Sequence, residues 1–279
     1  MSRGLRVFSA EDGAGTSCVF GICASGLVGY DSGMKPFLIL QLRPEAEASD
    51  GEYAAILEKG GLTAAQAHRV CLDRETLPDG LQLSDYAGVI VGGGPGCVSD
   101  DPATKDPVEA RIEADILSLM PEITARDVPF MGCCYGIGIL GHHLGAEVSK
   151  RQYGEAVGPV TCRVTDAGAD DALVAGLPLA FDAFVGHKEA VQNLPDGCVH
   201  LLASDPCPYQ MIRYGQNVYA TQFHPEADAG VFEDRIRIYR HRGYFAPETA
   251  DDLIAMCHAS DVTVPVEILR RFVARYGNR

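Results

Sequence analysis

Short apolar segments alternate with segments of helical spacing through the first half of the chain, and this alternation constrains the fold most. The helical segments cover residues 49–60, with Asp50 as the cap and a glycine stop, and residues 106–120. Alternating strands and helices form a mostly parallel sheet covered by helices. The sequence therefore predicts a three-layer α/β fold. The candidate strands are residues 36–43, 67–72, 87–91 and 128–131.

Beyond residue 156 the pattern changes to paired strands, which predicts an antiparallel β extension. Near the C-terminus, Val266, Leu269, Phe272 and Val273 share one helical face. We expect one domain over 34–244, a helical extension over 245–279 packed on the same domain, and a loosely ordered leader over 1–33. The extension strands are expected at 158–164, 183–191, 199–203 and in a hairpin over 210–222 that turns at 214–217.

Charge and cysteine usage narrow the functional classes. Lys and Arg number 23 against 38 Asp and Glu, a net charge of -15 that disfavours nucleic acid and anionic membranes. No apolar stretch approaches the roughly 20 residues of a membrane helix. The ten cysteines form no CxxC pair, which favours a reducing, cytoplasmic compartment. His142 and His143 lack a third residue at ligand spacing, so we expect no metal site.

A nucleophile elbow is predicted where the strand over 128–131 runs into Gly132-Cys133-Cys134-Tyr135-Gly136. Only Cys134 has a glycine two residues before it and two residues after it, so Cys134 is the candidate nucleophile and Cys133 is expected in the core. A thiol at a helix N-terminus is expected to have a lowered pKa. The adjacent N–H groups could bind an oxyanion. On a purely structural interpretation both are core thiols.

The same segment matches a dinucleotide-binding fingerprint, since Gly136, Gly138 and Gly141 follow the pattern GxGxxG. The acidic residue expected about 20 positions later should end a second strand, but the region around Glu155 is polar and rich in glycine. A dinucleotide-binding module therefore stays an alternative hypothesis.

A base and an orienting acid are supplied by Phe223-His224-Pro225-Glu226 at the end of a predicted strand. The proline turns the chain out of the strand, so that His224 and Glu226 can face the same side. A carboxylate on one ring nitrogen would direct the other toward the thiol. Taken alone, such a triplet is commonly a surface pair.

Three motifs in this order resemble those of the class I (triad) glutamine amidotransferases, closest to the amidotransferase domain of GMP synthase and its stand-alone relatives. They are Gly93-Gly94-Pro95, the elbow and Phe223-His224-Pro225-Glu226. Residues 151–154 and 186–189 also resemble elements of that group. The resemblance spans about residues 35–230 and implies a flavodoxin-like fold without a cofactor.

The resemblance also implies residue roles. Cys134 would attack the amide of glutamine and form a γ-glutamyl thioester, His224 would carry the proton to ammonia, and Glu226 would orient His224. The N–H groups of Gly94 and Tyr135 would form the oxyanion hole. Gly93, Gly138, Gln152, Tyr153 and His187 are candidate substrate-binding residues; His187 could equally be a satisfied loop histidine, and Cys97 is expected to be a packing residue.

One departure from the family pattern concerns the substrate. The family usually has glutamine at the position of Gly138, where it helps to hold the substrate. We therefore keep two hypotheses that use the same triad: a glutaminase that supplies ammonia to a separate synthetase chain, and a hydrolase of γ-glutamyl peptides. The sequence lacks a P-loop, which would place acceptor activation on that partner. The acceptor and the oligomeric state are not determined by the sequence.

Overall fold

The computed structural model describes residues 34–277. A nine-stranded sheet forms the centre of this part of the chain. The expected leader over 1–33 lies outside the described residues. The strands of this sheet are β1 (Phe37–Gln41), β2 (Ala67–Cys71), β3 (Gly88–Val91), β4 (Phe130–Cys133), β6 (Glu155–Val164), β7 (Ala180–His187), β9 (Cys198–Ala203), β10 (Met211–Tyr214) and β11 (Val218–Thr221).

The strand order is β2-β1-β3-β4-β11-β10-β9-β6-β7. Strands β2, β1, β3, β4 and β11 pair in parallel, whereas β10, β9, β6 and β7 are added by antiparallel pairing. The predicted parallel sheet with an antiparallel extension is therefore confirmed. Because β4 lies between β3 and β11, the loops that leave these three strands meet at one edge of the sheet.

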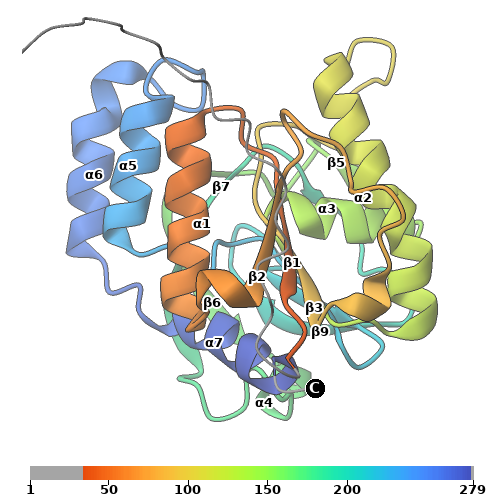
Figure 1. Cartoon of the computed structure of the whole chain (residues 1–279). Coiled ribbons are helices and arrows are strands. Elements are labelled where there is room, and N and C mark those ends of the chain that lie inside the picture. The colour runs from red at the N-terminus through yellow and green to blue at the C-terminus, as the bar shows by residue number, and fades with distance from the viewer. Residues whose placement is uncertain (1–33, 278–279) are drawn as a thin grey trace, which may run out of the picture. The chain divides into compact units, whose positions relative to one another are not determined.

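Helices cover both faces of the sheet, as Figure 1 shows: α1, α5 and α6 lie on one side, and α2 and α3 on the other. Alternate residues of β1 serve the two layers, with Phe37 and Ile39 in one apolar core and Leu38 and Leu40 in the other. The helices are α1 (Ala46–Gly60), α2 (Pro107–Arg126), α3 (Tyr135–His143), α4 (Asp166–Ala169), α5 (Ala229–Tyr239), α6 (Ala250–Ala259) and α7 (Val264–Tyr276), with short 3₁₀ turns η1 (Ala64–Gln66), η2 (Leu83–Asp85) and η3 (Pro247–Thr249).

Two helix ends differ from the sequence-based prediction. Helix α1 begins at Ala46 after Glu45, so Asp50 is not its cap; instead Asp50 lies within the helix and forms an ion pair of 2.8 Å with Arg69. Helix α2 continues through Pro121 to Arg126, because the buried stripe that includes Met120 extends to Ile123. A proline removes one helical hydrogen bond, but burial of the next turn outweighs this loss.

The predicted strand over 183–191 is divided in two. β7 ends at His187, and β8 (Ala190–Val191) pairs with β5 (Val148–Ser149) in a small separate antiparallel sheet. This small sheet lies against α3. Residues 188–189 therefore connect the main sheet to the small sheet that packs against α3.

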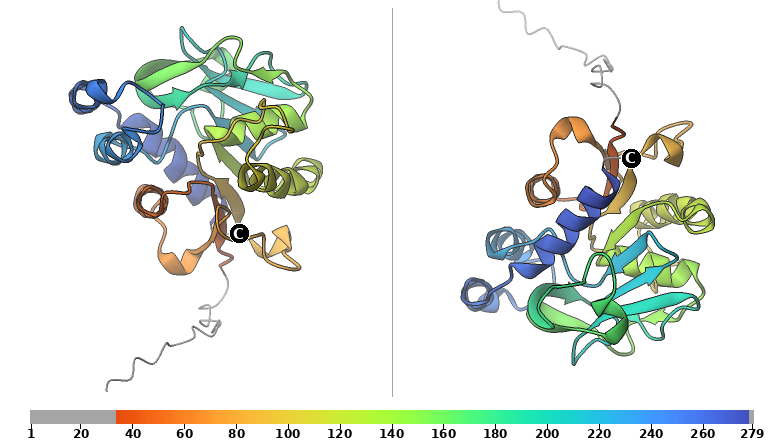
Figure 2. Two further views of the ribbon diagram at one scale, coloured as in Figure 1. Left: turned by 90° about the horizontal axis from the view of Figure 1, so that it is seen from above. Right: turned by 90° about the horizontal axis from the view of Figure 1, so that it is seen from below.

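The C-terminal helices pack on the same side as α1, as both views of Figure 2 show. Leu269, Phe272 and Tyr276 of α7 belong to the core that also contains Phe37 of β1. The aromatic rings of Phe37 and Phe272 have centroids 6.0 Å apart. The apolar core thus continues beyond residue 245. Among the described residues, no helix has the length and apolar character needed to cross a bilayer.

Candidate active site

The backbone at Cys134 adopts the conformation of a sharp strand-to-helix elbow. Cys134 directly follows β4, precedes the first residue of α3, and has φ 55° and ψ -88°, a region that costs energy for a residue with a side chain. A Cβ at Gly132 would lie 2.9 Å from the backbone of Gly136, so the first glycine of the motif is required by close approach. At Gly136 itself a Cβ would make only ordinary contacts of 3.8 Å or more. As expected, Cys133 is buried in the core.

The Cys134 side chain is partly exposed and lines a groove, but its pKa does not shift in the expected direction. Burial by surrounding protein raises the pKa of Cys134 to about 12, while Arg43 acts to lower it and Glu226 to raise it. Removal of water from the thiol is the largest influence on this pKa, and it acts against the lowering that the sequence predicted. Cys134 therefore carries a neutral thiol, which would need a base to become a nucleophile.

His224 follows β11 and is 4% exposed. Its Nδ1 forms a hydrogen bond of 2.9 Å with Glu226 Oε1, whereas Nε2 makes no hydrogen bond to any described residue. Burial lowers the pKa of His224 below its ordinary value, and the charge of Glu226 only partly opposes this. The imidazole is thus held by one nitrogen in its neutral form, with the other nitrogen available to accept a proton.

A buried charge network that the sequence did not reveal surrounds Glu226. Arg235 of α5 donates to Glu226 Oε1 over 2.7 Å and lies 3.6 Å from Glu52 Oε2, which also accepts from Arg43 Nε over 2.8 Å. His224 and Arg235 hold the pKa of Glu226 far below its usual range, despite burial. Glu226 is therefore a carboxylate that favours the protonated form of His224 when a proton arrives.

The loop after β3 approaches the imidazole so closely that only glycine fits. A Cβ at Gly93 would lie 2.5 Å from His224 Cε1, and one at Gly94 would lie 2.8 Å from Leu42 Cβ. No described residue accepts a hydrogen bond from the backbone N–H of Gly94 or of Tyr135. Both predicted oxyanion donors are therefore free to bind a ligand oxygen.

The groove has two lobes that share Gly94, Cys134, Gly186 and Tyr244. The first lobe encloses about 420 Å³ of atom-free space that includes its open mouth, and the second about 480 Å³. Tyr135, Gly138 and the segment His187–Ala190 line the first lobe. His224, Arg43 and Arg235 line the second, with apolar side chains of β6 and α5.

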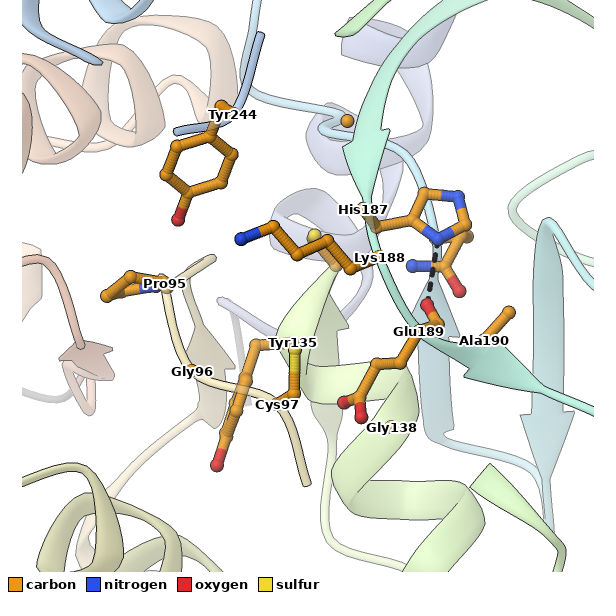
Figure 3. A pocket seen from close by; sticks show the side chains of 14 residues that line it. Pro95, Gly96, Cys97, Tyr135, Gly138, His187, Lys188, Glu189, Ala190 and Tyr244 are labelled. Atoms are coloured by element: carbon orange, nitrogen blue, oxygen red, sulfur yellow. Dashed lines mark hydrogen bonds between the residues drawn. The ribbon is translucent and has the colours of Figure 1, made fainter. Parts of the chain in front are cut away.

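Two charged side chains that sequence reasoning passed over define the first lobe. Figure 3 shows the ammonium group of Lys188 directed toward Tyr244, and its Nζ lies 5.0 Å from the centre of that ring. Glu189 accepts hydrogen bonds from the N–H groups of Val98 (2.8 Å) and Ser99 (2.9 Å). Its carboxylate lies over Gly138, where a Cβ would be 3.0 Å from Glu189 Oε1. Lys188 and Glu189 could have been predicted from the sequence, because they follow His187 in a segment that resembles the family.

The other predicted substrate-binding residues divide into two groups. His187 lines the first lobe, but both ring nitrogens are already bonded, Nδ1 to Glu189 O (2.8 Å) and Nε2 to Glu155 Oε2 (2.7 Å). His187 therefore has both ring nitrogens bonded, at a strand end and not in a loop, and it is also part of the wall of the first lobe. Gln152 and Tyr153 are not among the residues that line either lobe.

The two remaining glycines of the GxGxxG pattern are explained by packing within the chain. A Cβ at Gly141 would lie 2.8 Å from Val191 of β8, and Gly138 is covered by Glu189. This face of α3 is thus occupied by the chain's own residues, where a dinucleotide would need to bring its phosphates. Cys97 is buried, in agreement with a packing role, and burial raises the pKa of its thiol to about 11.

Two buried clusters bring three potential metal ligands each within 4.8 Å of one another. In both clusters the histidine and a glutamate are hydrogen-bonded to each other, so an ion would have to displace existing bonds. Of the predicted non-ligands, His142 is exposed, and His143 Nε2 is 2.9 Å from Thr124 Oγ1. The clusters are Glu155, His187 and Cys207, and Glu52, His224 and Glu226.

Comparison with known proteins gives one consistent family. Residues 55–238 match the family Glutamine amidotransferase class-I. A GMP synthase [glutamine-hydrolyzing] from Thermosipho africanus is 33% identical over 160 residues, which cover 56% of this chain and 27% of that protein. The chain therefore spans only about a quarter of that relative.

Solved structures agree in fold. A glutamine amidotransferase from Thermotoga maritima superposes with a TM-score of 0.71 at 19% identity, covering 88% of this chain and 99% of its own. Another, from Methylobacillus flagellatus, has a TM-score of 0.63 at 23% identity, covering 87% and 95%. The match over residues 55–238 includes the elbow, the glycine loop and the His224 segment, and the chain belongs to the class I glutamine amidotransferase family.

Proposed function

We propose that the chain hydrolyses the side-chain amide of glutamine, with Cys134 as nucleophile, His224 as base and Glu226 as the residue that orients the base. The observation that carries this proposal is the arrangement around His224. Its Nδ1 is held by Glu226, its Nε2 has no hydrogen-bond partner among the described residues, and it lines the same lobe as the strained Cys134. A neutral imidazole and a neutral thiol that line the same lobe are the combination that general-base activation of the nucleophile requires.

The reaction would be two acyl transfers. His224 Nε2 takes the thiol proton as Cys134 Sγ attacks the γ-carbonyl carbon, and the N–H groups of Gly94 and Tyr135 stabilise the oxyanion. The C–N bond then breaks, and His224 gives the proton to the leaving nitrogen. Water, deprotonated by His224, attacks the thioester, which releases glutamate and restores the thiol.

The first lobe is proposed to hold the amino-acid end of the substrate. It presents an ammonium group from Lys188 and a carboxylate from Glu189, which would pair with the α-carboxylate and the α-ammonium of glutamine. Gln222 also lines this lobe, and its buried Oε1 has no hydrogen-bond partner among the described residues. These groups would replace the contact that the family glutamine makes at the position of Gly138.

We further propose that the ammonia is consumed by a synthetase on a separate chain. The name of a matched relative, GMP synthase [glutamine-hydrolyzing], supports the link to a synthetase, because that name joins glutamine hydrolysis to a synthetase reaction. The amidotransferase region would then supply ammonia, and acceptor activation would take place elsewhere. A hydrolase of γ-glutamyl peptides is the second candidate, favoured by Glu189 over Gly138 and by the additional space of the second lobe.

The test is labelling with diazo-oxo-norleucine, a glutamine-analogue electrophile, followed by peptide mapping and a glutaminase assay. We expect the label on Cys134, with loss of label and of activity in Cys134→Ala. Cys133→Ala is the matched control, since Cys133 is adjacent in the chain but points into the core. Label on Cys133, or glutaminase activity that persists in Cys134→Ala, would refute the proposed nucleophile.

A further inference from the structure

The two side-chain contacts of Glu226 meet at one oxygen atom. His224 Nδ1 lies 2.9 Å and Arg235 Nη2 2.7 Å from Oε1. The other oxygen, Oε2, is buried and has no hydrogen-bond partner among residues 34–277. A carboxylate can turn about its last carbon–carbon bond, and a second contact on the same oxygen restricts that turning. Arg235 therefore helps to decide which oxygen the imidazole meets.

Arg235 is itself held in place by an acid from another helix. It lies on α5, and its Nη2 is 3.6 Å from Oε2 of Glu52, a fully buried residue of α1. The same Oε2 accepts from Arg43 Nε over 2.8 Å, and Oε1 of Glu52 accepts from Gln41 Nε2 over 3.1 Å. Acids and cations thus alternate from the end of β1 through α1 and α5 to the imidazole.

Stability alone does not explain a guanidinium at position 235. A buried ion pair can often be replaced by apolar residues of similar volume without loss of stability, because its charges must first be removed from water. The buried face of α5 also contains Phe232, Ile236 and Tyr239, so an apolar residue would suit the same face. The contact between Arg235 and Glu226 is the better reason for the charge.

Charges from several elements surround the imidazole of His224. Burial lowers the pKa of His224, Glu226 acts to raise it, and the two arginines act to lower it further. Arg235 therefore offsets part of the charge of Glu226 and favours the neutral imidazole. The charged groups are Glu226 on the same segment, Arg235 on α5, Arg43 just after β1 and Glu52 on α1, whose carboxylate comes within 4.8 Å of a ring nitrogen; the neutral thiol of Cys134 lines the same lobe.

We propose that Arg235 is a positioning residue for amide hydrolysis: anchored by Glu52, its guanidinium keeps Oε1 of Glu226 on Nδ1 of the catalytic histidine. The other ring nitrogen, Nε2, is then left to accept the proton of the thiol. This inference rests on the proposed triad and adds to it a residue that lies outside the three sequence motifs. In this role Arg235 acts through Glu226 and makes no contact with the reacting atoms.

Removal of the charge is the first test, with glutaminase kinetics measured across pH. In Arg235→Gln we expect kcat to fall about tenfold and KM for glutamine to change by less than about threefold, because the base is misplaced while the first lobe is untouched. The acidic limb of kcat/KM should move to higher pH by about one unit, because the imidazole loses a neighbouring positive charge and keeps Glu226.

A second variant keeps the charge and changes only its geometry. Arg235→Lys replaces the planar fork with a single ammonium group, so the limb should stay where it is in the unmodified protein while kcat still falls about threefold. Should Arg235→Gln fail to fold, Arg235→Lys carries the test, since it leaves a cation beside the buried acids. Arg237→Gln is the matched control, because Arg237 lies exposed on the same helix and pairs with Glu233 over 2.6 Å; its kinetics should not change.

The outcomes separate this inference from the proposed function. An unchanged kcat in either variant of Arg235 overturns the positioning role. A lower kcat in Arg235→Gln with an unmoved limb also overturns it, because that result describes a residue that only supports the fold. In both cases label from diazo-oxo-norleucine on Cys134 of the unmodified protein leaves the triad intact. Absence of both label and glutaminase activity in the unmodified protein removes the proposed function and this inference with it.

Discussion

Two buried histidines in this molecule are each bonded to a buried glutamate, and their surroundings differ. His224 is 4% exposed and 2.9 Å from Glu226, and His187 is 9% exposed and 2.7 Å from Glu155. At His187 the second ring nitrogen is bonded to a carbonyl, and Glu155 also accepts from Gln210 Nε2 over 2.6 Å. At His224 the second nitrogen, Nε2, makes no hydrogen bond within residues 34–277.

The difference teaches that burial and a carboxylate partner do not by themselves identify a base. A histidine with both nitrogens bonded holds its neighbours in place, and here His187 links β7 to β6 through Glu155. A histidine with one free nitrogen beside a thiol can exchange a proton. The surrounding charges differ as well, since Arg235 and Glu52 lie near Glu226, whereas neutral Ser204 and Gln210 contact Glu155.

We expect the largest effect on activity from replacing His224, the proposed base. His224→Gln should reduce kcat for amide hydrolysis by about 10²–10⁴, the usual contribution of general acid–base catalysis. Steady-state kinetics with glutamine and γ-glutamylglycine measure this. Should His187→Gln reduce kcat by as much, the distinction between the two histidines would be lost.

A smaller loss is expected from moving the same imidazole without removing it. Gly93→Ala would bring a Cβ to 2.5 Å from His224 Cε1 and displace the ring. A misplacement of about 1 Å can cost about 10² in rate. Gly96→Ala is the control in the same loop, because a Cβ there meets nothing nearer than 3.6 Å. Equal kcat/KM for the two alanine variants would contradict the proposed role of His224.

Replacement of His187, whose two ring nitrogens are both hydrogen-bonded, should mainly reduce the stability of the protein. His187→Gln breaks the bond to Glu155 and leaves a buried carboxylate with one donor fewer, so we expect the free energy of unfolding to decrease by about 1–3 kcal/mol. Urea denaturation monitored by circular dichroism measures the change. An unchanged midpoint, combined with a collapse of kcat, would exchange the roles assigned to the two histidines.

The mildest effect concerns pH. Because burial lowers the pKa of His224, the neutral base should persist below pH 6.5, the ordinary histidine value, and the acidic limb of kcat/KM should lie there. Glu226 acts to raise that pKa, so Glu226→Gln should shift the limb further toward acid while reducing kcat. A limb above pH 6.5 would show that protein burial does not govern the titration of this imidazole.

Local sequence patterns predicted the parts of the site that depend on neighbouring residues. Gly132 and Cys134 form the elbow within three positions, and His224 and Glu226 are separated by a proline that turns the chain. The predicted direction of the Cys134 pKa shift was wrong, because the helix N-terminus is visible in the sequence but the protein atoms that keep water from this partly exposed thiol are not. Gln152 and Tyr153 were expected at the substrate because residues 151–154 resemble a family element, but neither residue lines the groove.

The sequence alone determined the alternating strand and helix order, the antiparallel extension and the identity of the elbow, since each depends on spacing within a short segment. Only the tertiary structure decided which distant charges meet. Arg43, Glu52 and Arg235 come from β1's end, α1 and α5, and no local pattern brings together residues almost 200 positions apart. Pairing of β1 with β3 and packing of α1 against α5 bring these residues together, at the edge of the sheet where burial shifts the pKa values of the thiol and the imidazole toward their neutral forms.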